Sequence, residues 1–350
     1  MGWSPAKQCI EMIISDSLQQ AKLRLLQQPE TYLDRPFRVQ MIETRMSWVF
    51  LTQRYAYKLK KPVRYDYLDF STVALRKFYC QEELRLNRRL APEVYLAVIP
   101  ITRANGALQL DGAGEPIDWL VKMRRLPREK MLDELLEQGK VTDNHWQNLA
   151  TVLGRFYRAC DPIAMDGKEY RDRYRKSILQ NLEGLQAYPS QFPIEKGIVA
   201  CEAQLAFLEK HSDWFDARAE QGKIVEGHGD LRPCHICFEA STPVIIDCLE
   251  FNRDFRILDW ADDIAFLIME CDYLGANQFA HKFQNKFQEA ISDYPPNPLM
   301  YFYLAYRATL RARLALSRFQ EVAQKQWPQW RERAQRYMAL AANYCRQMQE

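Results

Sequence analysis

The sequence predicts an α+β protein of two lobes, a small antiparallel-sheet lobe and a larger, mostly helical one. Two observations predict this class. Strand-like runs dominate up to about residue 123, and helical periodicity dominates after it. The length of 350 residues also allows two lobes. We expect an N-terminal helical extension over 1–37, the sheet lobe over 38–123 and the helical lobe over 124–350.

Composition excludes several classes of protein. Hydrophobic residues at 47% and charged residues at 27% are ordinary for a globular chain, and a net charge of +3 is too mild to indicate nucleic acid. No run approaches the roughly 20 apolar residues of a membrane span, and no signal peptide is recognisable. Nine scattered cysteines indicate free thiols in a reducing compartment, so we expect a cytoplasmic protein. The oligomeric state is not indicated.

The first lobe is predicted from alternating runs and turn signals. An amphipathic helix is expected over Gln8 to Gln27. The expected strands are Arg38 to Glu43, Ser47 to Thr52, Tyr55 to Lys60, Val94 to Ile101, Ala107 to Leu110 and Ile117 to Met123. Asn105-Gly106 is a strong hairpin signal. One helix is expected from Ser71 or Thr72 to about Leu90, where Pro92 ends it.

The second lobe is predicted to be helical around one hairpin. Helical patterns cover about Glu129 to Glu137, Asp143 to Cys160, Tyr170 to Leu185 and Gly197 to Gln221. The runs His235 to Phe238 and Val244 to Ile246 then predict a hairpin, with another helix beginning near Leu258.

Two carboxylates flank this hairpin. Asp230 precedes its first strand and Asp247 follows its second, so we expect them close together in space. Phosphoryl transfer from ATP uses one carboxylate to orient the acceptor hydroxyl and another to hold the metal on the phosphates.

The order of residues around the hairpin strengthens this interpretation. Kinases have His-x-Asp, an Asn five residues later and a metal-binding Asp on the next strand. Here His228-Gly229-Asp230 is followed by His235 at the Asn position and then by Asp247. With Gly in the middle, the sequence resembles aminoglycoside phosphotransferases and choline-kinase-like enzymes, and Asp263-Ile264-Ala265 resembles their Asp-Leu-Ala element. The resemblance implies a protein-kinase-like fold, ATP and Mg²⁺.

The same resemblance assigns residues in the sheet lobe. Tyr55-Ala56-Tyr57-Lys58 resembles the Val-Ala-Ile-Lys of kinase strand three, which implies that Lys58 contacts the phosphates near Asp247. Lys60 shares a strand face with Lys58 and competes for this role. Glu83, beside the buried stripe of its helix, is the expected partner of the strand lysine; an exposed helical carboxylate is the alternative.

A narrower resemblance covers roughly residues 38–320. The segments Tyr57 to Val63, Glu82 to Pro92 and Asp247 to Asn252 are similar to those of an uncharacterised bacterial family of aminoglycoside-phosphotransferase-like proteins. Some members carry an additional P-loop kinase domain, but this chain has no GxxxxGK[ST] sequence.

Two departures from the kinase pattern bear on activity. The turn Thr44 to Ser47 has no glycine that could close over phosphates. His235 replaces the Asn expected to hold a second magnesium, and imidazole suits manganese or zinc better. We predict that His235 completes or flanks the metal site of Asp247, with Mn²⁺ as an alternative to Mg²⁺.

Several alternatives stay open. The first hypothesis is an ATP-dependent phosphotransferase acting on a small-molecule hydroxyl, with Asp230 and His228 catalytic; the second is a pseudokinase that binds a nucleotide or a partner. Eight acidic residues between Asp247 and Asp272 suggest a cationic acceptor, although they could equally cap helices or pair with arginines. Cys234-His235-Ile236-Cys237 is a weak zinc candidate because it lacks a second ligand pair.

Overall fold

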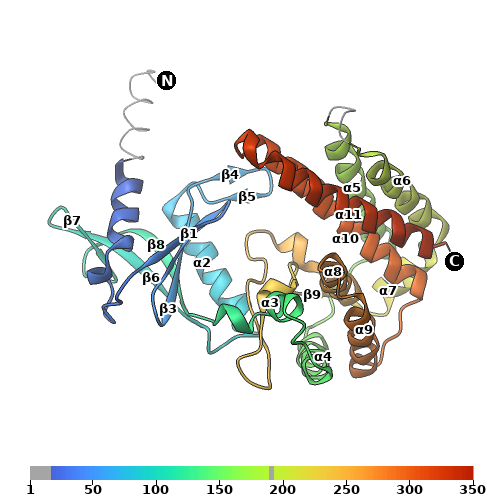
Figure 1. Ribbon diagram of the computed structural model, residues 1–350, viewed down its shortest axis with the longest axis horizontal. Helices are drawn as coiled ribbons and strands as arrows, with labels where there is room; N and C mark the ends of the chain where they lie inside the picture. The colour runs from blue at the N-terminus through green and yellow to red at the C-terminus, as the bar shows by residue number, and fades with distance from the viewer. Residues whose placement is uncertain (1–16, 189–192, 350) are drawn as a thin grey trace. The chain divides into compact units, whose positions relative to one another are not determined.

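The computed structural model describes residues 17–188 and 193–349 (Figure 1). The chain divides into two compact units. Unit 1 comprises Met1–Pro127 and Ile245–Asn252, and unit 2 comprises Arg128–Val244 and Arg253–Glu350. The short segment Ile245–Asn252 therefore groups with the sheet, whereas the sequence placed it in the helical lobe. Of the expected N-terminal helix, residues 8–16 lie outside the described residues, and residues 17–27 are helical.

Unit 1 is built on a six-stranded antiparallel sheet with the order β1-β2-β3-β8-β6-β7. Its strands are β1 (Gln40–Glu43), β2 (Ser47–Leu51), β3 (Tyr55–Lys60), β6 (Tyr95–Ala104), β7 (Ala107–Leu110) and β8 (Glu115–Arg124). The turn between β6 and β7 follows from Asn105 and Gly106, whose φ angles are +49° and +78°. Asn-Gly accepts this pair of left-handed conformations readily, so local sequence fixes the hairpin.

One helix of unit 1 carries residues of the candidate site. Helix α2 (Val73–Asn87) begins where the Thr72 hydroxyl accepts a hydrogen bond from the Leu75 N–H. It ends three residues before the predicted Leu90, because the N–H groups of Leu90 and Ala91 turn back to the Asn87 carbonyl. A small hairpin of β4 (Arg64–Tyr65) and β5 (Leu68–Asp69) precedes the helix.

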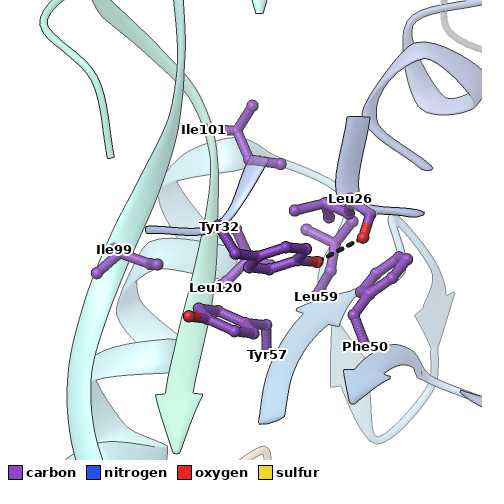
Figure 2. Packing of buried hydrophobic residues seen from close by; sticks show 8 residues of the cluster. All are labelled: Leu26, Tyr32, Phe50, Tyr57, Leu59, Ile99, Ile101 and Leu120. Carbon is purple, nitrogen blue, oxygen red and sulfur yellow. Dashed lines mark hydrogen bonds between the residues drawn. The ribbon is translucent and has the colours of Figure 1, made fainter. Parts of the chain in front are cut away.

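The core of unit 1 includes the segment before the first strand. Figure 2 shows its buried members, which are Leu26, Tyr32, Phe50, Tyr57, Leu59, Ile99, Ile101 and Leu120. The Tyr32 ring packs 4.8 Å from the Tyr57 ring, and its hydroxyl donates to the Leu26 carbonyl. Lys22 also forms a buried ion pair of 2.6 Å with Asp118 on β8. Residues that the sequence assigned to an extension are thus packed against the sheet.

Unit 2 is mainly helical (Figure 1). Its helices are α3 (Leu132–Glu137), α4 (Asp143–Arg158), α5 (Gly167–Gln186), α6 (Glu195–Lys210), α7 (Ser212–Glu220), α8 (Trp260–Tyr273), α9 (Asn277–Ile291), α10 (Asn297–Ser317) and α11 (Trp327–Gln347). The single helix predicted over Gly197 to Gln221 is two helices, because His211 has non-helical φ and ψ angles of −116° and 34°. Helix α8 is buried on all sides over Trp260 to Cys271, which is typical of a central helix.

Short elements complete the fold. The strands β9 (Ile224–Glu226) and β12 (Ile257–Asp259) pair with each other, as do β10 (Ile236–Cys237) and β11 (Val244–Ile245). The 3-10 helices are η1 (Pro29–Thr31), η2 (Arg128–Lys130), η3 (Pro233–His235), η4 (Arg253–Arg256), η5 (Arg318–Gln320) and η6 (Gln324–Gln326). The predicted hairpin is therefore present as β10 and β11, with η3 leading into it.

Two predictions about the whole chain are addressed by the described residues. No helix among them is long and apolar enough to cross a membrane. The cysteines from Cys80 onward are free thiols. No group of three neighbouring metal-ligating side chains within the described ranges includes a cysteine, so the zinc interpretation of Cys234 and Cys237 gains no support.

Candidate active site

Unit 1 holds one group of candidate functional residues, a cluster of charged side chains on β3, α2 and the segment Ile245–Asn252. Lys58 on β3 donates to Glu83 Oε1 and to Asp247 Oδ1, both at 2.8 Å. Lys60 donates to Glu83 Oε2 at 2.6 Å and also to Glu250. Glu83 on α2 therefore accepts one lysine on each carboxylate oxygen, and the exposed-carboxylate alternative is excluded because its side chain is fully buried.

The two glutamates of this cluster respond differently to burial. Lys58 and Lys60 face the carboxylates of Glu83, Asp247 and Glu250. Burial opposes ionisation of Glu83, but the two lysines outweigh it and lower its pKa. For Glu250 burial dominates and the pKa is raised.

Asp247 is positioned by its backbone as well as by Lys58. It has a φ of +62°, a left-handed conformation that is costly for a residue with a side chain. Its N–H donates to the Tyr95 hydroxyl at 3.0 Å, and the next N–H, of Cys248, donates to Asn87 Oδ1 at 2.8 Å. Residues on α2 and β6 thus hold this strained segment within unit 1.

Unit 2 holds a second group of candidate functional residues, in the loop from His228 to His235. The buried carboxylate of Asp263, near the start of α8, accepts hydrogen bonds from the His228 N–H at 2.6 Å and the Gly229 N–H at 3.1 Å. The Tyr157 hydroxyl donates to the same carboxylate at 2.9 Å. Asp263 therefore fixes the loop backbone, which explains why the Asp-Ile-Ala element accompanies the loop in the sequence.

Gly229 is required by the shape of this loop. Its φ is +80°, and a Cβ atom at this position would lie 3.0 Å from Arg256 Cβ and 3.2 Å from the Phe255 carbonyl oxygen. The next residue, Asp230, donates its N–H to Nδ1 of the fully buried His228 at 3.3 Å. His228 thus acts on the backbone of Asp230, which indicates a positioning function.

The side chain of Asp230 contacts a residue that the sequence did not indicate. Arg232 Nη2 donates to Asp230 Oδ2 at 2.7 Å and lies 3.0 Å from His235 Nε2. His235 Nδ1 lies 2.9 Å from the Asp230 carbonyl oxygen. No sequence signal singled out Arg232, because an arginine two residues after an aspartate is common on any surface.

The protonation state of His235 follows from these partners. A carbonyl oxygen only accepts and a guanidinium only donates, so Nδ1 carries the proton and Nε2 is the acceptor. Burial opposes protonation of the ring, but Cys234 and Asp230 beside it outweigh burial and raise its pKa to about 9. A protonated ring would turn a second N–H toward Arg232, so the 3.0 Å contact between His235 Nε2 and Arg232 Nη2 favours the neutral ring despite the raised pKa.

Most of the acidic residues that suggested a cationic acceptor have protein partners. Asp259 binds Arg218 and Asp262 binds Arg307, each through both carboxylate oxygens, with distances of 2.6–2.8 Å. Glu270 binds Arg311 at 2.7 Å. Asp263 accepts from the loop backbone, and Asp272 accepts from Tyr344. These carboxylates stabilise unit 2, which favours the helix-capping and arginine-pairing alternative.

The chain has sequence relatives in mycobacteria. No family model matches the chain. Uncharacterised proteins of Mycobacterium tuberculosis and Mycobacterium bovis are 32% identical to it over 290 residues. The match covers 82% of this chain and 56% of each mycobacterial protein, so the chain spans little more than half the length of these relatives.

Solved structures establish the fold. The GDP and kanamycin complex of APH(2")-IIia is similar with a TM-score of 0.50 and 13% identity, over 92% of this chain and 99% of that one. A thermostable mutant of aminoglycoside phosphotransferase APH(4)-Ia is similar with a TM-score of 0.51 and 12% identity, over 86% and 94% of the two chains. The predicted α+β class is confirmed, and the chain has the fold of the aminoglycoside phosphotransferases.

Proposed function

We propose that this protein is an ATP-dependent phosphotransferase that transfers a phosphoryl group to a hydroxyl of a small molecule. The observation that supports this most directly is the ion pair between Lys58 and Asp247, which are 189 residues apart in sequence. Glu83 holds the same lysine from the other side. A phosphate-binding lysine and a metal-binding carboxylate serve this reaction on the same fold.

The unit 1 cluster fits one divalent cation with its nucleotide. Asp247 offers carboxylate oxygens, which are the ligands that Mg²⁺ prefers, and its side chain is 39% exposed. A bound cation would neutralise charge on the transferring phosphoryl group, and Lys58 would contact the phosphates.

The unit 2 loop supplies the residue for the acceptor. Asp230 orients the acceptor hydroxyl and receives its proton as the oxygen forms a bond to the γ-phosphorus and the bond to the departing ADP oxygen breaks. Arg232 donates a hydrogen bond of 2.7 Å to this carboxylate and so orients it. His228 and Asp263 fix the loop. Since the acids of α8 are paired, the structure gives no preference for a cationic acceptor.

The proposal is tested by nucleotide binding and by turnover with a metabolite library. Asp230→Asn is expected to bind ATP with Mg²⁺ or Mn²⁺ as the unmodified protein does and to lower turnover by roughly 10²- to 10⁴-fold. Asp247→Asn is expected to abolish the metal dependence of ATP binding. Arg64→Gln, on an exposed side chain of β4, is the control and should change neither quantity. Unchanged metal-dependent binding in Asp247→Asn would contradict the assignment.

A pseudokinase is the second candidate, and the turn before β2 favours it. Thr44 and Ser47 exchange hydrogen bonds of 2.9–3.0 Å across this turn, so it is closed without a glycine that could follow the phosphates. Metal-dependent ATP binding without turnover across the metabolite library, in both the unmodified protein and Asp230→Asn, would support the pseudokinase.

A further inference from the structure

The second metal position of the kinase pattern does not fit this chain. In protein kinases the Asn five residues after the catalytic Asp binds a second magnesium. Here that position is His235, and both of its ring nitrogens have protein partners within unit 2. Nδ1 donates to the Asp230 carbonyl at 2.9 Å, and Nε2 accepts from Arg232 at 3.0 Å.

A cation on this ring would collide with Arg232. Metal–imidazole bonds are about 2.0–2.1 Å long, so an ion on Nε2 would occupy the direction in which Arg232 Nη2 already lies. The ion would also face a like charge there. Moreover, a hard ion such as Mg²⁺ prefers oxygen to nitrogen. The contact with Arg232 argues against His235 as a ligand of that ion, and the metal role of His235 stays a prediction.

Arg232 has the properties of a replacement for that cation. Its guanidinium is always charged, and Nη2 binds Asp230 Oδ2 at 2.7 Å. Its Nε atom is buried and has no hydrogen-bond partner among the residues that the structure describes. Buried donors are nearly always satisfied, so this N–H is available to an acceptor group of a ligand beside Asp230. A phosphoryl oxygen is such an acceptor, and arginine is suited to bind it.

We propose that Arg232 replaces the second metal ion, so that the protein uses one divalent cation, at Asp247, together with one guanidinium. This inference rests on the proposed phosphotransferase function and specifies its charge arrangement. His235 is then a positioning residue, which holds the guanidinium through Nε2 and the Asp230 backbone through Nδ1.

The experiment counts Mn²⁺ ions by electron paramagnetic resonance in the presence of a non-hydrolysable ATP analogue. The unmodified protein is expected to bind one Mn²⁺ per nucleotide. His235→Asn alone should also bind one, because Arg232 remains. The double variant Arg232→Met/His235→Asn removes the guanidinium and restores an oxygen ligand, so it should bind two, as kinases with Asn do. Arg232→Lys/His235→Asn is the matched control and should bind one.

Each result has a distinct meaning. Two Mn²⁺ ions on the unmodified protein, or one on the double variant with Met, would overturn the role of Arg232 and leave the phosphotransferase proposal standing. Absence of any Mn²⁺-nucleotide complex on the folded, unmodified protein would overturn both. Circular dichroism and the thermal midpoint establish that each variant is folded, and Arg232→Gln/His235→Asn is a second charge-removing variant should the Met variant not fold.

Discussion

The unit 1 cluster and the unit 2 loop are stabilised in different ways. The unit 1 cluster joins residues far apart in sequence through buried ion pairs, as with Lys60 and Glu250, which are 190 residues apart. The unit 2 loop is held mostly by hydrogen bonds among residues that are two to five positions apart. Asp263, which is distant in sequence, accepts a hydrogen bond from the loop backbone. Removing one partner of a buried ion pair leaves an uncompensated charge and strongly lowers the free energy of unfolding. Losing one hydrogen bond in a short loop costs less. Stability should therefore depend on the cluster more strongly than on the loop.

The largest expected effect is at Lys60. Replacing it with methionine leaves Glu83 and Glu250 buried with one lysine fewer, and breaking such a pair costs about 3–5 kcal/mol of unfolding free energy. Lys61→Met is the matched control, since the adjacent Lys61 pairs with the 58% exposed Glu43 and should cost about 1 kcal/mol or less. Urea unfolding of both variants measures the difference. Equal costs would show that the cluster is not a tightly coupled unit.

The second comparison separates the two buried carboxyls of the cluster. Glu83→Gln should cost roughly 2 kcal/mol more than Glu250→Gln at pH 7, because Glu83 is stabilised as an anion and Glu250 is not. The pH trends should be opposite. The lowered pKa of Glu83 gives stability that is present above its ordinary value of 4.5 and lost as pH falls. The raised pKa of Glu250 gives a cost that disappears as pH falls through it.

Urea unfolding at several pH values between 7 and 4 tests these trends. The advantage of the unmodified protein over Glu83→Gln should shrink below about pH 4.5, and its advantage over Glu250→Gln should grow as pH falls from 7. If the free energies of unfolding of the two variants changed with pH in the same way, Glu83 and Glu250 would not differ in their tendency to ionise.

The smallest expected effect is in the loop. Gly229→Ala should cost about 1–2 kcal/mol from its left-handed backbone, plus the contact of the new methyl group with Arg256. Gly275→Ala is the matched control, because Gly275 also has a φ of +80° but has open space around it. The difference in thermal unfolding between the variants isolates the contact with Arg256, and only Gly229→Ala should reduce turnover. Equal losses of stability would exclude a steric contribution from that contact.

The sequence patterns predicted the features that depend on neighbouring residues, namely strand bounds, a turn and the face of a strand on which side chains lie. The alternating pattern predicted β3 with the first and last residues that the structure gives it. Asn105-Gly106 predicted the hairpin between β6 and β7. The strand face predicted that Lys58 and Lys60 point the same way, which their shared partner Glu83 agrees with. The functional roles of these residues remain predictions.

Partnerships between distant residues could not be predicted. The carboxylates near α8 suggested a charged wall, because the arginines that neutralise them, such as Arg218 and Arg307, lie more than 40 positions away. Tyr95, whose hydroxyl accepts a hydrogen bond from the Asp247 N–H, lies in no sequence motif that would have indicated this contact. Arg232 was missed because its importance arises from the two side chains it contacts.

The discontinuity of unit 1 has a consequence for synthesis on the ribosome. Residues up to Pro127 emerge first, but the partners of Lys60 and Asn87 within Ile245–Asn252 emerge only after the first part of unit 2. At about 5–20 residues per second, this delay is on the order of 10 s. During that interval Lys60 lacks Glu250, and Asn87 lacks the Cys248 N–H. The N-terminal sheet therefore completes its charge cluster late, although it is translated first, and truncation before residue 252 leaves it unfinished.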